Sequence, residues 1–163
     1  MSASRSDRER IAELLDFQAG RLDVAVLDEA GIRRLLGGSP RIAVVGASAS
    51  PFRPSHGVLV GLRRAGYDVV PVNPAESEID GVSCYPTLAA AVAATGPITI
   101  VDVFRRADAC PEHAREAVEA GARCLWLQLG VVSAEAARIA RAAGLDVVMD
   151  RCTLIEHDRL VGG

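Results

Sequence analysis

Short apolar runs alternate with longer amphipathic segments from residue 41 to residue 150, and this alternation limits the fold more than any other feature of the chain. Each apolar run holds valine, isoleucine or leucine at consecutive positions. Consecutive apolar residues indicate a strand that is buried on both faces, as in a parallel sheet covered by helices on both sides. The predicted strands are 42–46, 68–72, 98–104, 124–130 and 145–150.

The segments between these strands have helical periodicity. The predicted helices are 55–65, 87–95, 111–121 and 133–144. Glycine commonly follows a helix, and three helices lead into the next strand through one: Gly66, Gly121 and Gly144. Right-handed crossovers between successive strands then give a doubly wound sheet. We therefore predict an α/β, Rossmann-like fold, with a five-stranded parallel sheet and helices on both of its faces.

Residues 1–38 precede this alternation and are predicted to form a helical extension, which leaves 39–163 for the Rossmann-like domain. One short helix is expected over residues 27–36. An earlier helix is expected from the spacing of three apolar residues: Ile11, Leu14 and Leu15. A helical extension of this kind is a candidate contact in a homodimer.

Charge and cysteine usage exclude several classes of protein. The net charge is -3, which disfavours a general nucleic-acid-binding role. All 18 basic residues are arginine, so the chain lacks the lysine that P-loop proteins need. No apolar leader follows the charged first residues, and proline and glycine interrupt the long uncharged run 81–101, so neither secretion nor a membrane span is expected. The four widely spaced cysteines are expected to be reduced, in a cytoplasmic protein.

The loop after the first predicted strand is the candidate binding site. Ligands of open parallel sheets bind beyond the carboxyl ends of the strands, where the strand order reverses. The helix that follows this loop offers free backbone N–H groups and a positive dipole end to a phosphate. The loop begins at Gly46, adds hydroxyl groups at Ser48, Ser50 and Ser55, and adds positive charge at Arg53.

The loop lacks the dinucleotide fingerprint G-x-G-x-x-G, because Gly57 and Gly61 come too late in the sequence. In NAD-binding proteins an acidic residue after the second strand holds the ribose, but this chain has Asn73 at that position. NAD is therefore disfavoured, and another phosphate-bearing nucleotide is favoured. The alternative is an ordinary strand-to-helix loop in which Ser55 caps the helix.

Several motifs occur in the order that a known family shows: VVGASASPFRPSHGVLVGLRRAGYDVVPVNP, EIDGVSCYPTL, VDVFRRAD, LWLQLGV and AAGLDVVMDRC. The chain resembles the stand-alone CoA-binding proteins of the Rossmann type, which are similar to the CoA-binding domain of the succinyl-CoA synthetase α subunit. The resemblance spans about residues 28–160. Residues 1 to about 27 lie outside it, as an extension expected to be particular to this chain.

The resemblance implies coenzyme A as the cofactor and assigns residues to its parts. It implies that the pyrophosphate lies in the turn Gly46, Ala47 and Ser48, near Ser50, Arg53 and Ser55. It implies that the adenosine end is flanked by Asn73, Pro74, Val103, Phe104 and Arg105. It implies that the pantetheine arm is lined by Gln128 and Gly130. An acidic residue after the second strand would repel the 3′-phosphate of coenzyme A, so its absence is expected. Arg53, ahead of Arg105, is the candidate to pair with phosphate.

No complete catalytic centre is predicted. The stretch GASAS lacks the last glycine of the nucleophile elbow G-x-S-x-G, and residues 150–157 lack a zinc ligand set. Asp150 and Arg151 are expected to form an ion pair. Cys152 is expected to be either a small buried apolar residue or a thiol that forms a mixed disulfide with coenzyme A.

The predicted function is therefore non-catalytic binding of coenzyme A or an acyl-CoA. Two alternatives stay open. In the first alternative, the chain is an α-like CoA-binding subunit of an acyl-CoA ligase, and a partner chain supplies the remaining chemistry. In the second, it is an NAD(H)-binding redox sensor.

Overall fold

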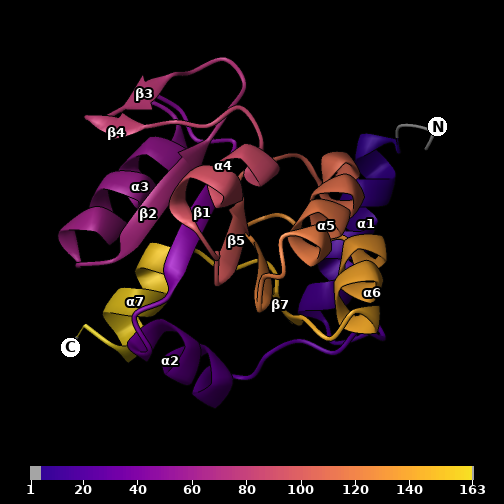
Figure 1. Ribbon diagram of the computed structural model, residues 1–163. Coiled ribbons are helices and arrows are strands. Elements are labelled where there is room, and N and C mark those ends of the chain that lie inside the picture. The colour runs from indigo at the N-terminus through magenta and orange to yellow at the C-terminus, as the bar shows by residue number, and fades with distance from the viewer. Residues whose placement is uncertain (1–4, 163) are drawn as a thin grey trace.

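The computed structural model describes residues 5–162 and has a five-stranded parallel sheet at its centre, in the order β2–β1–β5–β6–β7 (Figure 1). The strands are β1 (Arg41–Val45), β2 (Asp68–Val72), β5 (Ile100–Val103), β6 (Cys124–Leu127) and β7 (Asp146–Val148). The predicted Rossmann-like fold is confirmed. The strand order reverses at β1, because the chain passes outward to β2 and then returns to β5 on the other side of β1.

The register of the strands brings their carboxyl ends to one level. Val45 of β1 lies beside Val72 of β2 and Val103 of β5, and Val103 lies beside Leu127 of β6. The next residue of each strand therefore reaches the same edge of the sheet. These residues are Gly46, Asn73, Phe104 and Gln128.

Helices cover both faces of the sheet, as Figure 1 shows. One face carries α2 (Glu29–Gly37), α3 (Pro54–Arg64) and α7 (Thr153–Leu160). The other carries α4 (Leu88–Thr95), α5 (Cys110–Glu119) and α6 (Ala134–Ala142). Side chains of a strand alternate between the faces, so Val44 packs under the first layer and Val45 under the second. No helix within the described part of the chain is long and apolar enough to cross a membrane.

The first helix, α1 (Asp7–Gln18), lies across the carboxyl end of the sheet. Ser6 and Glu9 form a capping box at its start, and none of its residues is buried. Polar contacts attach it along its length to three different elements. Arg10 pairs at 2.7 Å with Asp108 of the short helix η1 (Ala107–Ala109), Glu13 accepts from the N–H of Ala134 at 2.8 Å, and Gln18 donates to Asp150 at 2.9 Å.

Besides strands and helices that end up to three residues earlier or begin up to two residues later than predicted, the structure differs from the sequence-based predictions in three main places. A small antiparallel hairpin, β3 (Glu78–Ile79) with β4 (Val82–Ser83), occupies a segment that was expected to be loop. The C-terminal helix α7 was not predicted. The helix expected over 27–36 begins at Glu29, because the side chain of Asp28 accepts from Gly31 and caps it.

Candidate functional site

A cavity of about 730 Å³ lies where the strand order reverses, at the carboxyl ends of the strands. This volume falls within the range of small-molecule sites. The loop after β1 and the start of α3 contribute Gly46, Ser48, Arg53 and Ser55. The ends of the other strands contribute Asn73, Phe104, Arg105 and Gln128. The start of α7 completes the wall with Cys152 and Ile155.

Gly46 allows two chain segments to approach closely at the floor of this cavity. Its φ of +84° lies in the left-handed region, which glycine adopts without strain. A Cβ atom at this position would lie 2.6 Å from the backbone oxygen of Phe104. The turn after β1 therefore rests directly on the segment after β5, and only glycine fits there.

We expect Gly46→Ala to lower the free energy of unfolding by about 1–3 kcal/mol, through backbone strain and overlap with the Phe104 carbonyl. Urea unfolding measures this change. Gly144→Ala is the matched control, because Gly144 has a φ of +87° but a Cβ atom there would meet no other atom within 4 Å. If both substitutions cost the same, the close approach to Phe104 contributes nothing and the backbone conformation explains the whole effect.

Hydrogen bonds hold the loop after β1 in a fixed shape. The amide of Asn73 donates to the backbone oxygen of Ala47 at 2.7 Å, and its oxygen accepts from the N–H of Ala75 at 2.8 Å. The hydroxyl oxygen of Ser48 accepts from the N–H of Ser50 at 3.1 Å. The O–H of Ser48 keeps its proton free to donate into the cavity.

The start of α3 is suited to an anion. Arg53 occupies the N-cap position but makes no capping hydrogen bond with its side chain. The alternative in which Ser55 caps the helix is wrong, because Ser55 is the second helical residue. Ser55 is only 3% exposed and lines the cavity, and its hydroxyl has no partner among the described residues. An uncapped helix N-terminus with an unpaired hydroxyl beside it favours a negatively charged group.

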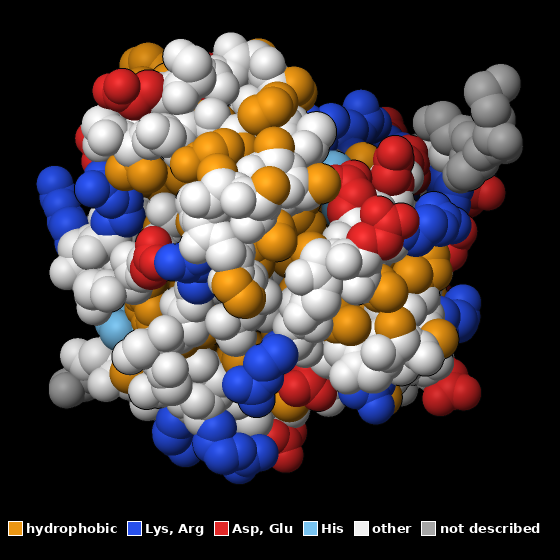
Figure 2. Space-filling model, in the orientation of Figure 1, with side chains coloured by type: hydrophobic (Ala, Val, Ile, Leu, Met, Phe, Trp, Pro, Cys, Tyr) orange, Lys and Arg blue, Asp and Glu red, His pale blue; other side chains and the backbone are white. Residues whose placement is uncertain are grey.

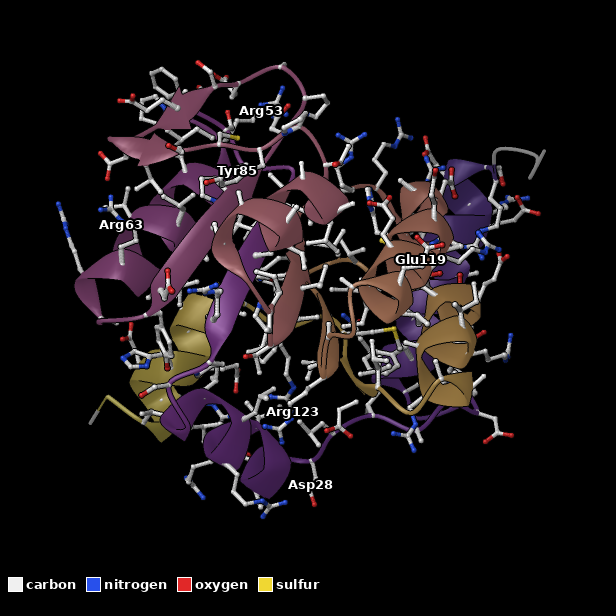
Figure 3. The ribbon with its side chains drawn as sticks, in the orientation of Figure 1. Asp28, Arg53, Arg63, Tyr85, Glu119 and Arg123 are labelled. Carbon is white, nitrogen blue, oxygen red and sulfur yellow. The ribbon has the colours of Figure 1, made fainter. Side chains whose placement is uncertain are left out.

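The charges around the cavity are all positive. Arg53 and Arg105 line it and make no ion pair within residues 5–162, whereas Arg106 lies 3.8 Å from Asp7. Figure 3 shows Arg53 at one end of α3 and Arg63 at the other. None of the described residues that line the cavity is acidic. Positive charge without acidic neighbours favours an anionic ligand.

A second large hollow has the opposite character. It lies between α4 and α5 and has a volume of about 630 Å³. Figure 2 shows apolar side chains over α4 and acidic side chains on α5 beside them. The acids that line it are Glu112, Glu116 and Glu119. An anionic ligand is therefore disfavoured between α4 and α5 and favoured at the carboxyl ends of the strands.

A buried carboxyl group beneath the cavity fixes the side chain of Gln128. Asp102 of β5 is fully buried, and it accepts from the amide nitrogen of Gln128 and from the hydroxyl of Thr153 at 2.9 Å. The same amide nitrogen lies 3.3 Å from the Thr153 hydroxyl. Burial, partly offset by these hydrogen bonds, raises the pKa of Asp102 to about 7. Because the nitrogen of Gln128 is engaged in the core, its oxygen is the atom left to accept from a ligand.

Sequence reasoning missed Asp102, although a signal was present. The residue is a carboxylate in the middle of the continuous apolar run 98–104, where charge is costly unless it is paired. Its partners were not visible, since Gln128 and Thr153 come from a different strand and from the helix that was not predicted.

Cys152 differs from the other three cysteines. Cys84, Cys110 and Cys124 are buried, whereas Cys152 is half-buried and lines the cavity. Burial raises the pKa of the Cys110 and Cys124 thiols. Cys152 was expected to be either a small buried apolar residue or a thiol within reach of coenzyme A; it packs partly buried against a core and also lines the cavity.

The neighbouring polar residues have other partners than expected. The predicted ion pair between Asp150 and Arg151 is wrong, because Arg151 pairs with Glu156 at 3.3 Å and Asp150 accepts from Gln18 and from the N–H of Gly130. Within the described chain, no three cysteine, histidine or acidic side chains are grouped to hold a metal.

Five residues assigned from the resemblance lie outside the cavity lining. Val103, the last residue of β5, is buried in one core, and Ala47, in the loop after β1, is buried in the other, so neither side chain reaches the cavity. Ser50 supports Ser48 through its backbone, Pro74 is exposed, and Gly130 packs against Asp150. The cavity instead gains residues that the sequence did not indicate: Pro54, Val58, Leu129, Val131 and Ile155.

Comparisons with known proteins give consistent results. The family described as "CoA binding domain" matches residues 40–158. The uncharacterized protein YneT of Bacillus subtilis is 41% identical over 129 residues, which are 79% of this chain and 93% of YneT. The solved structure of a hypothetical protein from Pyrococcus horikoshii is 33% identical, with a TM-score of 0.78, and the match covers 99% of this chain and 100% of that one. The N-terminal extension is therefore not particular to this chain.

One structural relative is a domain of a larger enzyme. The dinucleotide-forming acetyl-coenzyme A synthetase 1 of Candidatus Korarchaeum cryptofilum is 25% identical, with a TM-score of 0.58. The match covers 71% of this chain but only 27% of the synthetase.

Proposed function

Because the chain belongs to the CoA-binding-domain family, we propose that it binds coenzyme A or an acyl-CoA at the carboxyl ends of its parallel strands and catalyses no reaction by itself. The observation that carries this proposal is the acid-free cavity at the reversal of strand order. Coenzyme A brings a pyrophosphate and a 3′-phosphate, and a cavity with unpaired arginines and an uncapped helix N-terminus suits such a ligand.

The pyrophosphate is assigned to the start of α3. Ser48 and Ser55 offer hydroxyl donors there, and Arg53 offers a guanidinium. Arg105, on the neighbouring segment after β5, is placed to pair with a further phosphate. Charge-assisted hydrogen bonds of these kinds are stronger than neutral ones, so this end of the ligand supplies most of the affinity.

The remaining parts of the ligand extend from this point along the strand ends. Phe104 is half-buried at the cavity and offers its ring to the adenine. Asn73 stands where NAD-binding proteins need an acid, and both ends of its amide are engaged by the loop, which supports coenzyme A over NAD. The oxygen of Gln128 is available to the amide N–H groups of the pantetheine arm.

The lining supports binding rather than catalysis. Its hydroxyl and thiol groups come from Ser48, Ser55 and Cys152, but no histidine or carboxylate among the described lining residues stands beside them as a general base. His157, which follows Cys152 closely in sequence, hydrogen-bonds the Tyr67 hydroxyl at 2.6 Å. The lining residues are thus assigned to holding and orienting the ligand.

Native mass spectrometry of the purified protein, followed by analysis of the ligand released on denaturation, tests the proposed function. The expected result is a released mass equal to that of coenzyme A or an acyl-CoA. A mass increase that survives denaturation and disappears with reductant, and is absent from Cys152→Ser, would identify a mixed disulfide at Cys152. Release of NAD, or a protein that stays empty when coenzyme A is added, would refute the proposal.

The similarity to acetyl-coenzyme A synthetase favours one further candidate. This chain corresponds to about a quarter of that enzyme, so it is also suited to act as the CoA-binding subunit of an acyl-CoA ligase. Affinity purification from the source cells distinguishes the two roles. Recovery of a stoichiometric ligase partner chain supports the subunit role, and recovery of the chain alone, loaded with ligand, supports independent binding.

A further inference from the structure

A second hollow, of about 340 Å³, adjoins the proposed coenzyme A site. One of its walls comes from the N-terminal segment: Phe17, Gln18, Val26 and Leu27. Three residues line both this hollow and the larger cavity: Leu129, Cys152 and Ile155. The two spaces therefore meet at Leu129 and at the start of α7.

The N-terminal wall is attached to the sheet at fixed points. The N–H of Leu27 donates to the backbone oxygen of Val147 in β7 at 2.8 Å. At the end of α1, the amide of Gln18 donates to Asp150 at 2.9 Å. The hollow is therefore bounded by anchored segments on both sides.

The polar groups that line this hollow are already satisfied by one another. Gln18 bonds to Asp150, and Arg151 pairs with Glu156, which also accepts from Arg159 at 2.6 Å. These groups do not need a polar ligand. A charged or strongly hydrogen-bonding occupant is therefore disfavoured.

Three apolar side chains around the hollow are left largely uncovered by other residues. Leu129 is 64% exposed, Ile155 is 53% exposed and Val26 is 42% exposed. Scattered apolar residues are normal on a surface, but here three large ones border one hollow, which is typical of a binding site for an apolar group.

We propose that this hollow, named the acyl pocket, holds the acyl chain of an acyl-CoA thioester, so that the preferred ligand is an acyl-CoA rather than free coenzyme A. This inference rests on the proposed function. A pantetheine arm that starts from the phosphates at α3 and passes Gln128 ends at Leu129, Cys152 and Ile155, where the acyl pocket opens. Its volume is about twice the roughly 150 Å³ that hold benzene in a protein cavity, which suits an unbranched chain of medium length.

Calorimetric titration of the full chain with free coenzyme A and with acetyl-, butyryl- and hexanoyl-CoA tests the acyl pocket. We expect the affinity to rise by about fourfold for each methylene that is buried. Val26→Phe fills the pocket from its outer wall. In that variant we expect the gain with chain length to disappear and the affinity for free coenzyme A to stay unchanged.

Leu15→Phe is the matched control, because Leu15 is an exposed residue of the same N-terminal segment and lines neither space. It is expected to leave every affinity unchanged. If free coenzyme A binds but longer chains bring no gain, or if the gain survives Val26→Phe, the acyl pocket is refuted and the proposed function stands. If no ligand binds, both proposals fail. If the wild type sediments as a dimer and Val26→Phe as a monomer, without a change in chain-length preference, a second copy covers the hollow and the acyl pocket is refuted.

Discussion

The double variant Ser48→Ala/Arg53→Ala is expected to bind coenzyme A about 3 kcal/mol less tightly, on the order of a hundredfold in Kd. Ser48 accepts from the N–H of Ser50 and keeps its O–H free, and we propose that this O–H donates to a charged phosphate. Arg53 is exposed, so water and salt screen part of its contribution. Calorimetric titration at low and physiological ionic strength separates the contributions of Ser48 and Arg53 to the binding free energy. The contribution of Arg53 is expected to decrease as salt is added.

Arg63→Ala is the control for this variant. Arg63 lies in the same helix as Arg53, but at its far end, where it pairs with Asp80 at 3.2 Å (Figure 3). Removing it takes away the same charge without touching the cavity, and the affinity for coenzyme A is expected to stay within a factor of about two. An unchanged affinity in the double variant would place the phosphates elsewhere in the molecule.

Asp102→Asn is expected to change the way in which stability depends on pH. The pKa of Asp102 is raised from an ordinary 3.8 to about 7 by burial. Between these two values the folded protein holds a proton that the unfolded chain has released, so its stability decreases as the pH rises through this window. Each pKa unit corresponds to about 1.4 kcal/mol, so this group destabilises the fold by about 4 kcal/mol above pH 7 relative to pH 4.

Urea unfolding at pH 4, 5.5 and 8 measures the effect. An asparagine keeps the shape of Asp102, can accept from Gln128 and can donate to the Thr153 hydroxyl, but it carries no charge. The stability of Asp102→Asn minus that of the wild type is therefore expected to rise by about 4 kcal/mol from pH 4 to pH 8. Glu119→Gln, at an exposed acid on α5, controls for the change in net charge. Parallel pH profiles for Asp102→Asn and the wild type would show that the buried carboxyl does not titrate in this window.

The sheet could be predicted from the sequence because each strand is identified by the residues of its own segment. Consecutive apolar residues identify buried strands, and Gly66, Gly121 and Gly144 end their helices at positive φ as expected. The position of the cavity followed from the same pattern, since the strand order of a doubly wound sheet fixes where its edge opens. Gly46, Ser48, Arg53, Asn73 and Arg105 were predicted in this way or from the resemblance, and all of them line the cavity.

The remaining features depend on contacts between distant segments. The helix α7 has a weak sequence pattern, and it is fixed by Thr153 against Asp102 and by Leu154 packing on Gly61 of α3. The helix α1 has no fully buried residue, so its place across the strand ends depends on the partly buried Leu14 and Phe17 and on single polar contacts with Asp108, Ala134 and Asp150. Propensity and periodicity contain no information about such partners.

The contacts that attach α1 to the rest of the molecule are few and only partly buried. Only Leu14 and Phe17 of this helix pack against the core, and neither is fully buried, so we expect α1 to separate from the sheet in a local opening that leaves the two cores intact. Its ionic attachment through Arg10 and Asp108 weakens as ionic strength rises. Because Phe17 and Gln18 of α1 line the acyl pocket, we expect such an opening to ease the entry and release of an acyl-CoA, and a long acyl chain that contacts both α1 and α7 to slow its own departure.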